Sequence, residues 1–231
     1  MSKKIAILQS NYIPWKGYFD LINLVDEFII FDTAQYTKND WRNRNKIKTN
    51  QGAKWLTIPV KHSLNQKINE TIVLNNSWRK KNWKTLLQNY SKAKYFKEYK
   101  DIFEELYLND EEQYLSIINY KFITQINNIL DIKTKIRWSS EFTLTNGKTK
   151  KLIDICKQCN ADTYISGPAA KDYFDIELAK NEEIKVEWMD YSNYKEYKQL
   201  HLPFEHGVSI LDLIFNEGKD AKNYLKSFNK E

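Results

Sequence analysis

The sequence predicts an α/β fold of the Rossmann-like class, with a mainly parallel sheet, flanking helices and a helical insertion. A short apolar run at 5–8 is followed by helically spaced apolar side chains over 15–25 and by a second apolar run at 28–31. A strand, a helix and a strand in this order form a βαβ unit, whose crossover is right-handed and whose strands are parallel. Further along the chain, apolar runs again alternate with helical patterns, which is typical of a parallel sheet.

The remaining elements follow from the same patterns. Short apolar runs predict strands within 133–142, 162–167 and 184–191. Helical spacing predicts a helix over 147–160. Another helix should begin at Ser209, which suits an N-cap, and break at Gly218 before a last helix that ends at 225. The polar stretch 37–52 predicts a hairpin arm whose strands flank a turn at Gly52.

The chain has 231 residues, of which 42% are apolar, so it is long enough to bury a sizeable core. No repeat or low-complexity linker divides it, and we expect a single domain over 1–231. Three consecutive helical patterns predict the helical insertion at about 77–130, with Asp110 as the expected cap of the third helix.

The net charge of +6 favours an anionic partner, such as a nucleotide, a phosphate, an acidic carrier protein or a membrane surface. A lysine-rich composition gives the same charge without any partner. No leader pattern and no apolar run near the roughly 20 residues of a membrane span are visible, so a cytoplasmic protein is expected. The two cysteines, Cys156 and Cys159, have no second pair and no suitably spaced histidines, so we expect no metal site.

Ligands of parallel sheets bind beyond the carboxyl ends of the strands. The segments 9–15 and 32–36 follow the first two predicted strands and should therefore share one crevice. Both segments are rich in aromatic and small residues that can shape a pocket wall. The candidate binding residues here are Asn11, Trp15, Gly17, Tyr18 and Tyr36.

A basic arm follows, in which five Lys or Arg residues stand against one acid, Asp40, over residues 38–48. Arginine side chains fork onto phosphate or carboxylate oxygens, and two of them two residues apart can hold one anion. A solvated loop is the alternative interpretation. The candidate anion-binding residues are Arg42, Asn43, Arg44 and Lys48, and we expect them to meet the segment 12–18 on one concave surface.

Two further features carry possible chemistry. The strand that ends at Ser166 runs into a Gly167-Pro168 turn, where small residues let backbone amides approach a ligand. His62, at a strand end, and His206, just before a helix, are possible general bases, although a single histidine is more often structural.

Three stretches of the sequence resemble the signature blocks of the WbqC-like family. They occur in the family's order and extend from about residue 5 to residue 218. This chain departs from the family pattern at Ser10, where the pattern has Pro, and at Asn82, where a His is expected. The stretches read QSNYIPWKGYFDLINLVDEFIIFDTAQYTKNDWRNRNKIKTNQGAKWLTIPV, YISGPAAKDYFD and FEHGVSILDLIFNEG.

The resemblance implies a role in bacterial surface-polysaccharide clusters, including O-antigen biosynthesis, as an amide-forming acyl or aminoacyl transferase. The acceptor would be the amino group of a nucleotide-linked amino deoxy sugar. The donor would be a carrier-protein thioester, coenzyme A or an aminoacyl-tRNA, so nucleic acid is expected only as tRNA, and no bound cofactor is expected. The alternatives are a non-catalytic binding protein of such a pathway and an ATP-dependent amide ligase, which the absence of phosphate-loop and H-x-G-H motifs disfavours.

The transferase hypothesis assigns roles to the candidate residues. Asp32 or His62 would accept the proton that the amine loses. Tyr12 or the Gly167 turn would donate hydrogen bonds to the tetrahedral oxyanion. Phosphates would bind the basic arm, and a sugar or base would stack on Trp15, Tyr18 and Tyr36.

Overall fold

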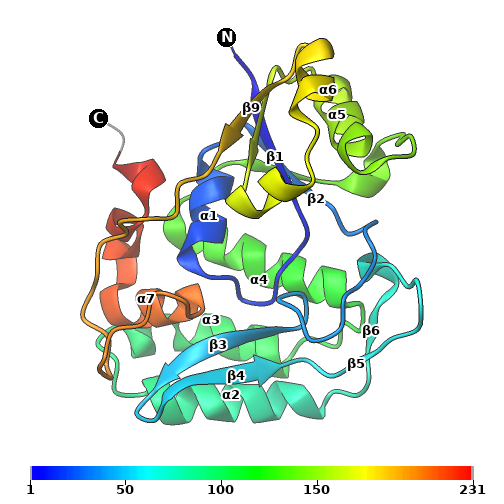
Figure 1. Cartoon of the computed structure of the whole chain (residues 1–231). Helices are drawn as coiled ribbons and strands as arrows, with labels where there is room; N and C mark the ends of the chain where they lie inside the picture. Colours follow the sequence, from blue (N-terminus) through cyan, green and yellow to red (C-terminus); the bar gives the residue numbers. More distant parts are fainter. Residues whose placement is uncertain (1, 230–231) are drawn as a thin grey trace.

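A parallel sheet of five strands forms the centre of the molecule (Figure 1). This computed structural model describes residues 2–229. The strand order is β7-β2-β1-β8-β9, and every pair of neighbours is parallel, so the predicted α/β fold with a mainly parallel sheet is confirmed. The strands are β1 (Lys4–Leu8), β2 (Glu27–Ile30), β7 (Lys135–Trp138), β8 (Thr163–Ser166) and β9 (Lys185–Trp188).

The sheet has one topological switch point. The chain adds β2 and then β7 on one side of β1, and returns to the other side for β8 and β9. The change of direction therefore lies between β1 and β8, and in open α/β sheets ligands bind outside the carboxyl ends of strands at such a point.

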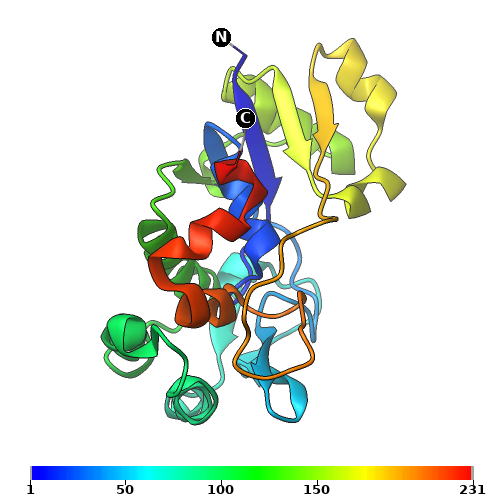
Figure 2. The same cartoon turned by 90° about the vertical axis from the view of Figure 1, so that its left-hand side faces the viewer.

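Helices cover both faces of the sheet, and Figure 2 shows the two layers on opposite sides of the strands. Ile5, Ile7 and Ile29 pack into one apolar cluster and Ala6 and Phe28 into the other. Strands buried on both faces give continuous apolar runs, which is why the sequence reveals them. The first layer holds α5 (Lys148–Gln158) and α6 (Ile176–Asn181), and the second holds α1 (Lys16–Asn23), α4 (Leu115–Leu130) and α7 (Ile210–Glu217).

The long insertion between β2 and β7 places a hairpin beside helices. Gly52 begins the second strand of the hairpin with φ +100°, a conformation that favours glycine, as the predicted turn requires. The third helix of the insertion begins at Leu115 and not at Asp110, so the predicted cap is wrong: the Asp110 carboxylate accepts from the Glu112 amide at 3.0 Å and from the Lys121 ammonium at 2.7 Å. The elements are β3 (Arg44–Thr49), β4 (Gly52–Thr57), β5 (Val60–Lys61), β6 (Ile72–Val73), α2 (Ser77–Tyr90), α3 (Phe96–Leu108) and α4.

A connection of about twenty residues, 189–209, joins β9 to α7 without regular secondary structure. Tyrosine hydroxyls fasten it to the body: Tyr194 donates to the Asp20 carboxylate at 2.5 Å and Tyr197 to that of Asp212 at 2.7 Å. The Ser209 hydroxyl accepts from the Leu211 amide, so the predicted N-cap is confirmed. Within residues 2–229 no helix is long and apolar enough to cross a membrane.

Candidate functional site

A cavity of about 320 Å³ lies at the carboxyl edge of the sheet. Three segments distant in sequence meet there. The Tyr12 amide donates to the Trp41 carbonyl at 3.0 Å, and the Ser209 amide donates to the Lys46 carbonyl at 2.7 Å. The structure thus brings the segment 12–18 and the basic arm together, as expected. The cavity is lined by Asn11, Trp15, Trp41, Asn45 and Gly207.

The opening of α1 shapes one wall of this cavity. A Cβ atom at Gly17 would lie 2.3 Å from Cζ2 of the Trp15 ring, so only glycine leaves room for the indole. The other side of the indole meets Tyr191, with ring centroids 5.1 Å apart. Trp15 is therefore held between α1 and the 189–209 connection.

Arg42 braces the cavity wall. Its guanidinium donates to the Asn11 side-chain carbonyl at 2.6 Å and to that of Gln9 at 2.5 Å, and it pairs with the Asp40 carboxylate at 3.3 Å. This fork fixes Asn11 so that its amide NH₂, which has no hydrogen-bond partner within residues 2–229, remains available to a ligand. Arg42 thus positions a polar group at the cavity, and its own charge is already opposed by Asp40.

Asp32 lies beneath the site. Only 1% of its surface is exposed, and it accepts from the Ser10 amide at 2.8 Å, from the Ser10 hydroxyl at 2.6 Å and from the Ser116 hydroxyl. Burial raises the pKa of this carboxyl, against the lowering effect of the hydrogen bonds. In this position Asp32 holds the start of the segment 9–15 and does not reach the cavity. Ser10, where the family pattern has Pro, supplies two of the three donors.

Three more predicted site residues lie in the interior. The Tyr12 hydroxyl is fully buried, 2.5 Å from that of Tyr107, and the buried Tyr18 hydroxyl donates to the Gln9 carbonyl. The ammonium of Lys48 donates to the Pro203 carbonyl and so ties the hairpin to the 189–209 connection. None of these three lines the cavity, so a direct contact with substrate is not available to them there.

The other predicted residues do not line the cavity. Asn43 is buried and donates to the Ile58 carbonyl. Tyr36 lies beside exposed His62, with ring centroids 6.2 Å apart, on the segment after β2. Ser166 is buried against Tyr164, and the position of Gly167 adjoins the Tyr191 ring that packs on Trp15. Arg44 lies on the outer face of the hairpin, over the Trp55 ring.

Trp41, Asn45 and Gly207 line the cavity and were not among the predicted site residues. Asn45 has a structural explanation, because its amide donates to the Tyr12 and Ile13 carbonyls. Trp41 could have been predicted from the sequence, because it directly precedes Arg42 within the basic arm. Gly207 follows His206, which the sequence marked only as a possible base.

His206 is exposed next to Gly207, and its ring packs edge-on against Phe204 with centroids 4.6 Å apart. Partial burial and the nearby Lys16 ammonium lower the pKa of this imidazole below its ordinary value of 6.5. His206 is therefore uncharged at neutral pH, which is the form that accepts a proton.

Lys16 is a buried ammonium in an aromatic cage. It lies 5.0 Å from the centroid of the Tyr194 ring, 5.4 Å from that of Tyr197 and 5.8 Å from that of Phe204. Burial lowers its pKa to about 8, against the raising effect of carboxylates led by Asp212.

This lowered pKa predicts a pH effect on stability. Between about pH 8 and the ordinary lysine pKa of about 10.4, the unfolded chain binds more protons at this site than the folded one, so the free energy of unfolding rises with pH. Lys16→Met should lack this rise, whereas Lys38→Met, at an exposed position, should keep it. Urea unfolding at a series of pH values measures the difference between wild type and variant. A difference that stays constant from pH 8 to 10 contradicts the prediction.

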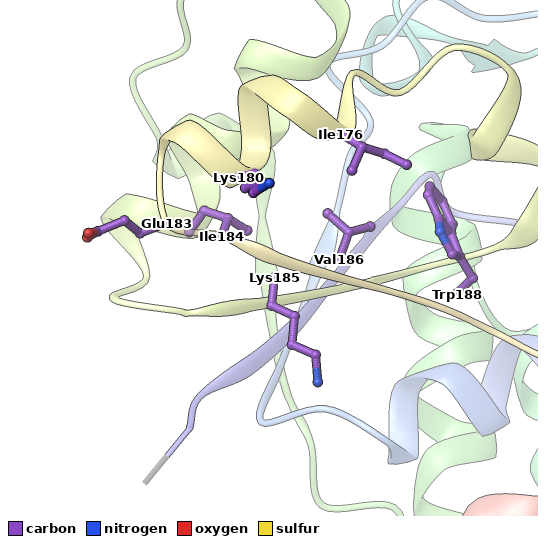
Figure 3. Close-up of a pocket in the computed structure, with 7 residues that line it drawn as sticks. All are labelled: Ile176, Lys180, Glu183, Ile184, Lys185, Val186 and Trp188. Atoms are coloured by element: carbon purple, nitrogen blue, oxygen red, sulfur yellow. The ribbon is translucent and has the colours of Figure 1, made fainter.

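Another hollow, of about 370 Å³, lies between α6 and edge strand β9 (Figure 3). It is lined by Ile176, Val186 and Trp188, while the polar groups of Glu183 and Lys185 point away from these apolar side chains. Lys180 is the remaining polar residue of this lining, whereas the cavity at the carboxyl edge combines two indole rings with the Asn11 and Asn45 side chains and so offers a polar substrate more.

The sequence matches one known protein family over nearly its whole length. The model of the WbqC-like protein family matches residues 9–224. The chain belongs to the WbqC-like protein family. The chain is similar to the uncharacterized protein Rv1507c of Mycobacterium tuberculosis. The two are 48% identical over 226 residues, which are 97% of this chain and 98% of that protein. No solved structure shows significant similarity. In this member of the WbqC-like family, the matched region includes all five residues that line the cavity.

Proposed function

We propose that this protein is an amide-forming acyl or aminoacyl transferase that modifies the amino group of a nucleotide-linked amino deoxy sugar. The observation that carries the proposal is the cavity at the carboxyl edge, which combines two indole rings with the free amide of Asn11. Its volume is at the lower end of the range of small-molecule pockets, about 300–1,000 Å³, and suits a sugar-sized group. Membership of the WbqC-like family supports the same assignment.

The chemistry requires a base and an oxyanion donor. The sugar amine attacks the acyl carbonyl carbon and a C–N bond forms. The C–S or C–O bond of the donor then breaks, and its sulfur or oxygen leaves with the electron pair and takes up the proton that the nitrogen loses. The nitrogen loses a proton, and His206 is the better acceptor because Asp32 is buried, while His206 directly precedes Gly207 of the cavity lining and His62 packs beside Tyr36 instead. The amide of Asn11, whose oxygen is held by Arg42, would donate to the tetrahedral oxyanion. Tyr12 and the Gly167 turn are not used in this mechanism.

A direct assay tests the proposal. Nucleotide-linked 3-amino and 4-amino deoxy sugars are incubated with acylated carrier protein, acyl coenzyme A or aminoacyl-tRNA. Each reaction is run with and without ATP, and the masses of the sugar nucleotides are measured by mass spectrometry. An amide formed without ATP is the expected result, and the productive donor is identified in the same experiment. Amide formation only with ATP would indicate a ligase, and binding without product a non-catalytic protein. Either result contradicts the proposal.

A further inference from the structure

The outer face of the β3–β4 hairpin combines cations with exposed indole rings. Lys46 pairs with Trp55 across the hairpin, and side chains two residues apart in a strand share a face, so Arg44 lies on this face as well. The Arg44 guanidinium is 4.2 Å from the Trp55 ring centroid, and the Lys46 ammonium is 5.2 Å from it. The Trp41 and Trp55 rings are 5.3 Å apart and are 42% and 38% exposed.

The two cations of this face are not neutralised. Within the part of the chain that the structure describes, neither Arg44 nor Lys46 forms an ion pair or a side-chain hydrogen bond, and Nε of Arg44 is buried without a partner. Their neighbours differ: Arg42 is paired with Asp40, and Lys48 is bound to the Pro203 carbonyl. With no acidic side chain paired to them among residues 2–229, these two cations leave the face a positive charge that an anionic ligand can neutralise.

We propose that this hairpin face binds the nucleoside diphosphate part of the substrate, with the base stacked on the exposed indoles and the phosphates on Arg44 and Lys46. This inference rests on the proposed function for the identity of the ligand. Aromatic rings and arginine planes stack on bases of any sequence, and guanidinium groups bind phosphate oxygens in pairs. Trp41 belongs to both the hairpin face and the cavity lining, so a nucleotide on this face leaves the attached sugar next to the cavity.

Of the residues predicted to bind phosphate, Arg44 is kept, and Lys46 takes the place of Arg42 and Lys48. Arg42 and Lys48 are already engaged with protein groups, so Arg44 and Lys46 carry the free positive charge. Trp55 replaces Tyr18 and Tyr36, which are buried, as the stacking residue.

Binding of uridine and thymidine diphosphates, their nucleosides and inorganic pyrophosphate, measured by calorimetry, tests this site. Trp55→Ala should weaken diphosphate binding roughly tenfold to a hundredfold, the effect of removing one stacking ring. Arg44→Gln should weaken it about tenfold and reduce its dependence on salt. Lys54→Gln is the matched control, because Lys54 is an exposed cation of the same hairpin whose strand position faces the other way. The affinity of the Lys54→Gln variant for the diphosphates should stay within twofold of wild type.

Folding is controlled with thermal melts and with Trp55→Phe, which keeps an aromatic ring and should retain most of the affinity. The inference is overturned if Trp55→Ala and Arg44→Gln bind the diphosphates as wild type does, or if Lys54→Gln loses as much. Diphosphate binding can be measured without amide formation, so the result of the calorimetry does not depend on the result of the transferase assay. If amide is formed while both variants keep the wild-type KM for the nucleotide sugar, the hairpin inference fails and the proposed function stands.

Discussion

His206→Gln is expected to lower kcat of the amide-forming reaction by roughly 10²- to 10⁴-fold, the usual contribution of a general base. Glutamine keeps a polar side chain of similar length but cannot accept the proton of the attacking amine. The imidazole is uncharged at neutral pH because partial burial and Lys16 lower its pKa. In wild type, kcat, which reports groups of the bound complex, should therefore hold at neutral pH and fall as the pH drops through the lowered pKa of the imidazole, below its ordinary value of 6.5.

The matched control for this prediction is His62→Gln, which makes the same exchange at an exposed histidine outside the cavity. It should leave kcat within twofold of wild type. A loss of activity in His62→Gln with none in His206→Gln would reverse the assignment. A rate that is independent of pH in wild type and unchanged in His206→Gln would remove the general base from the mechanism.

Asp32→Ala is expected to lower the free energy of unfolding by about 2–4 kcal/mol, because it leaves the buried Ser10 and Ser116 donors without an acceptor. Asp32→Asn keeps one acceptor oxygen and should cost less, about 1–2 kcal/mol. Urea unfolding measures both. Asp172→Ala, at an exposed acid, is the control and should change stability by less than about 0.5 kcal/mol.

The raised pKa of Asp32 gives this experiment a second readout. The folded carboxyl holds its proton to higher pH than the unfolded one, so this group makes the protein less stable as pH rises through the interval above its ordinary value of 3.8. Asp32→Asn should lack that decline. If Asp32→Asn instead abolishes activity while stability stays at the wild-type value at every pH, Asp32 is a catalytic base and not an anchor.

The sheet was predictable from the sequence because its strands are buried on both faces and are continuous in apolar residues. The hairpin was predictable from Gly52 and the cap of α7 from Ser209, since both depend on neighbouring residues only. The role of Asp110 was not predictable, because its partner Lys121 lies more than one turn inside α4.

Within the candidate site, the meeting of the first loop and the basic arm was predictable from strand order. The contacts and burial of each side chain were not predictable from the sequence. Tyr12 is buried because Tyr107 and Phe122 of the insertion pack on it. Lys48 is engaged by a carbonyl of the 189–209 connection, whose path has no local signal. The shared face of Lys46 and Trp55 follows from the hairpin register, which a turn at Gly52 fixes.

The proposed transferase must bind its substrate in the cavity beside Trp15. An NMR titration with a nucleotide-linked amino sugar, read on the indole N–H signals of the seven tryptophans, tests this directly. The signals are assigned with single Trp→Phe variants. The account predicts that Trp15 and Trp41 shift and saturate together, while Trp188, in the hollow of Figure 3, stays in place. Shifts at Trp188 without any at Trp15 and Trp41 would contradict it.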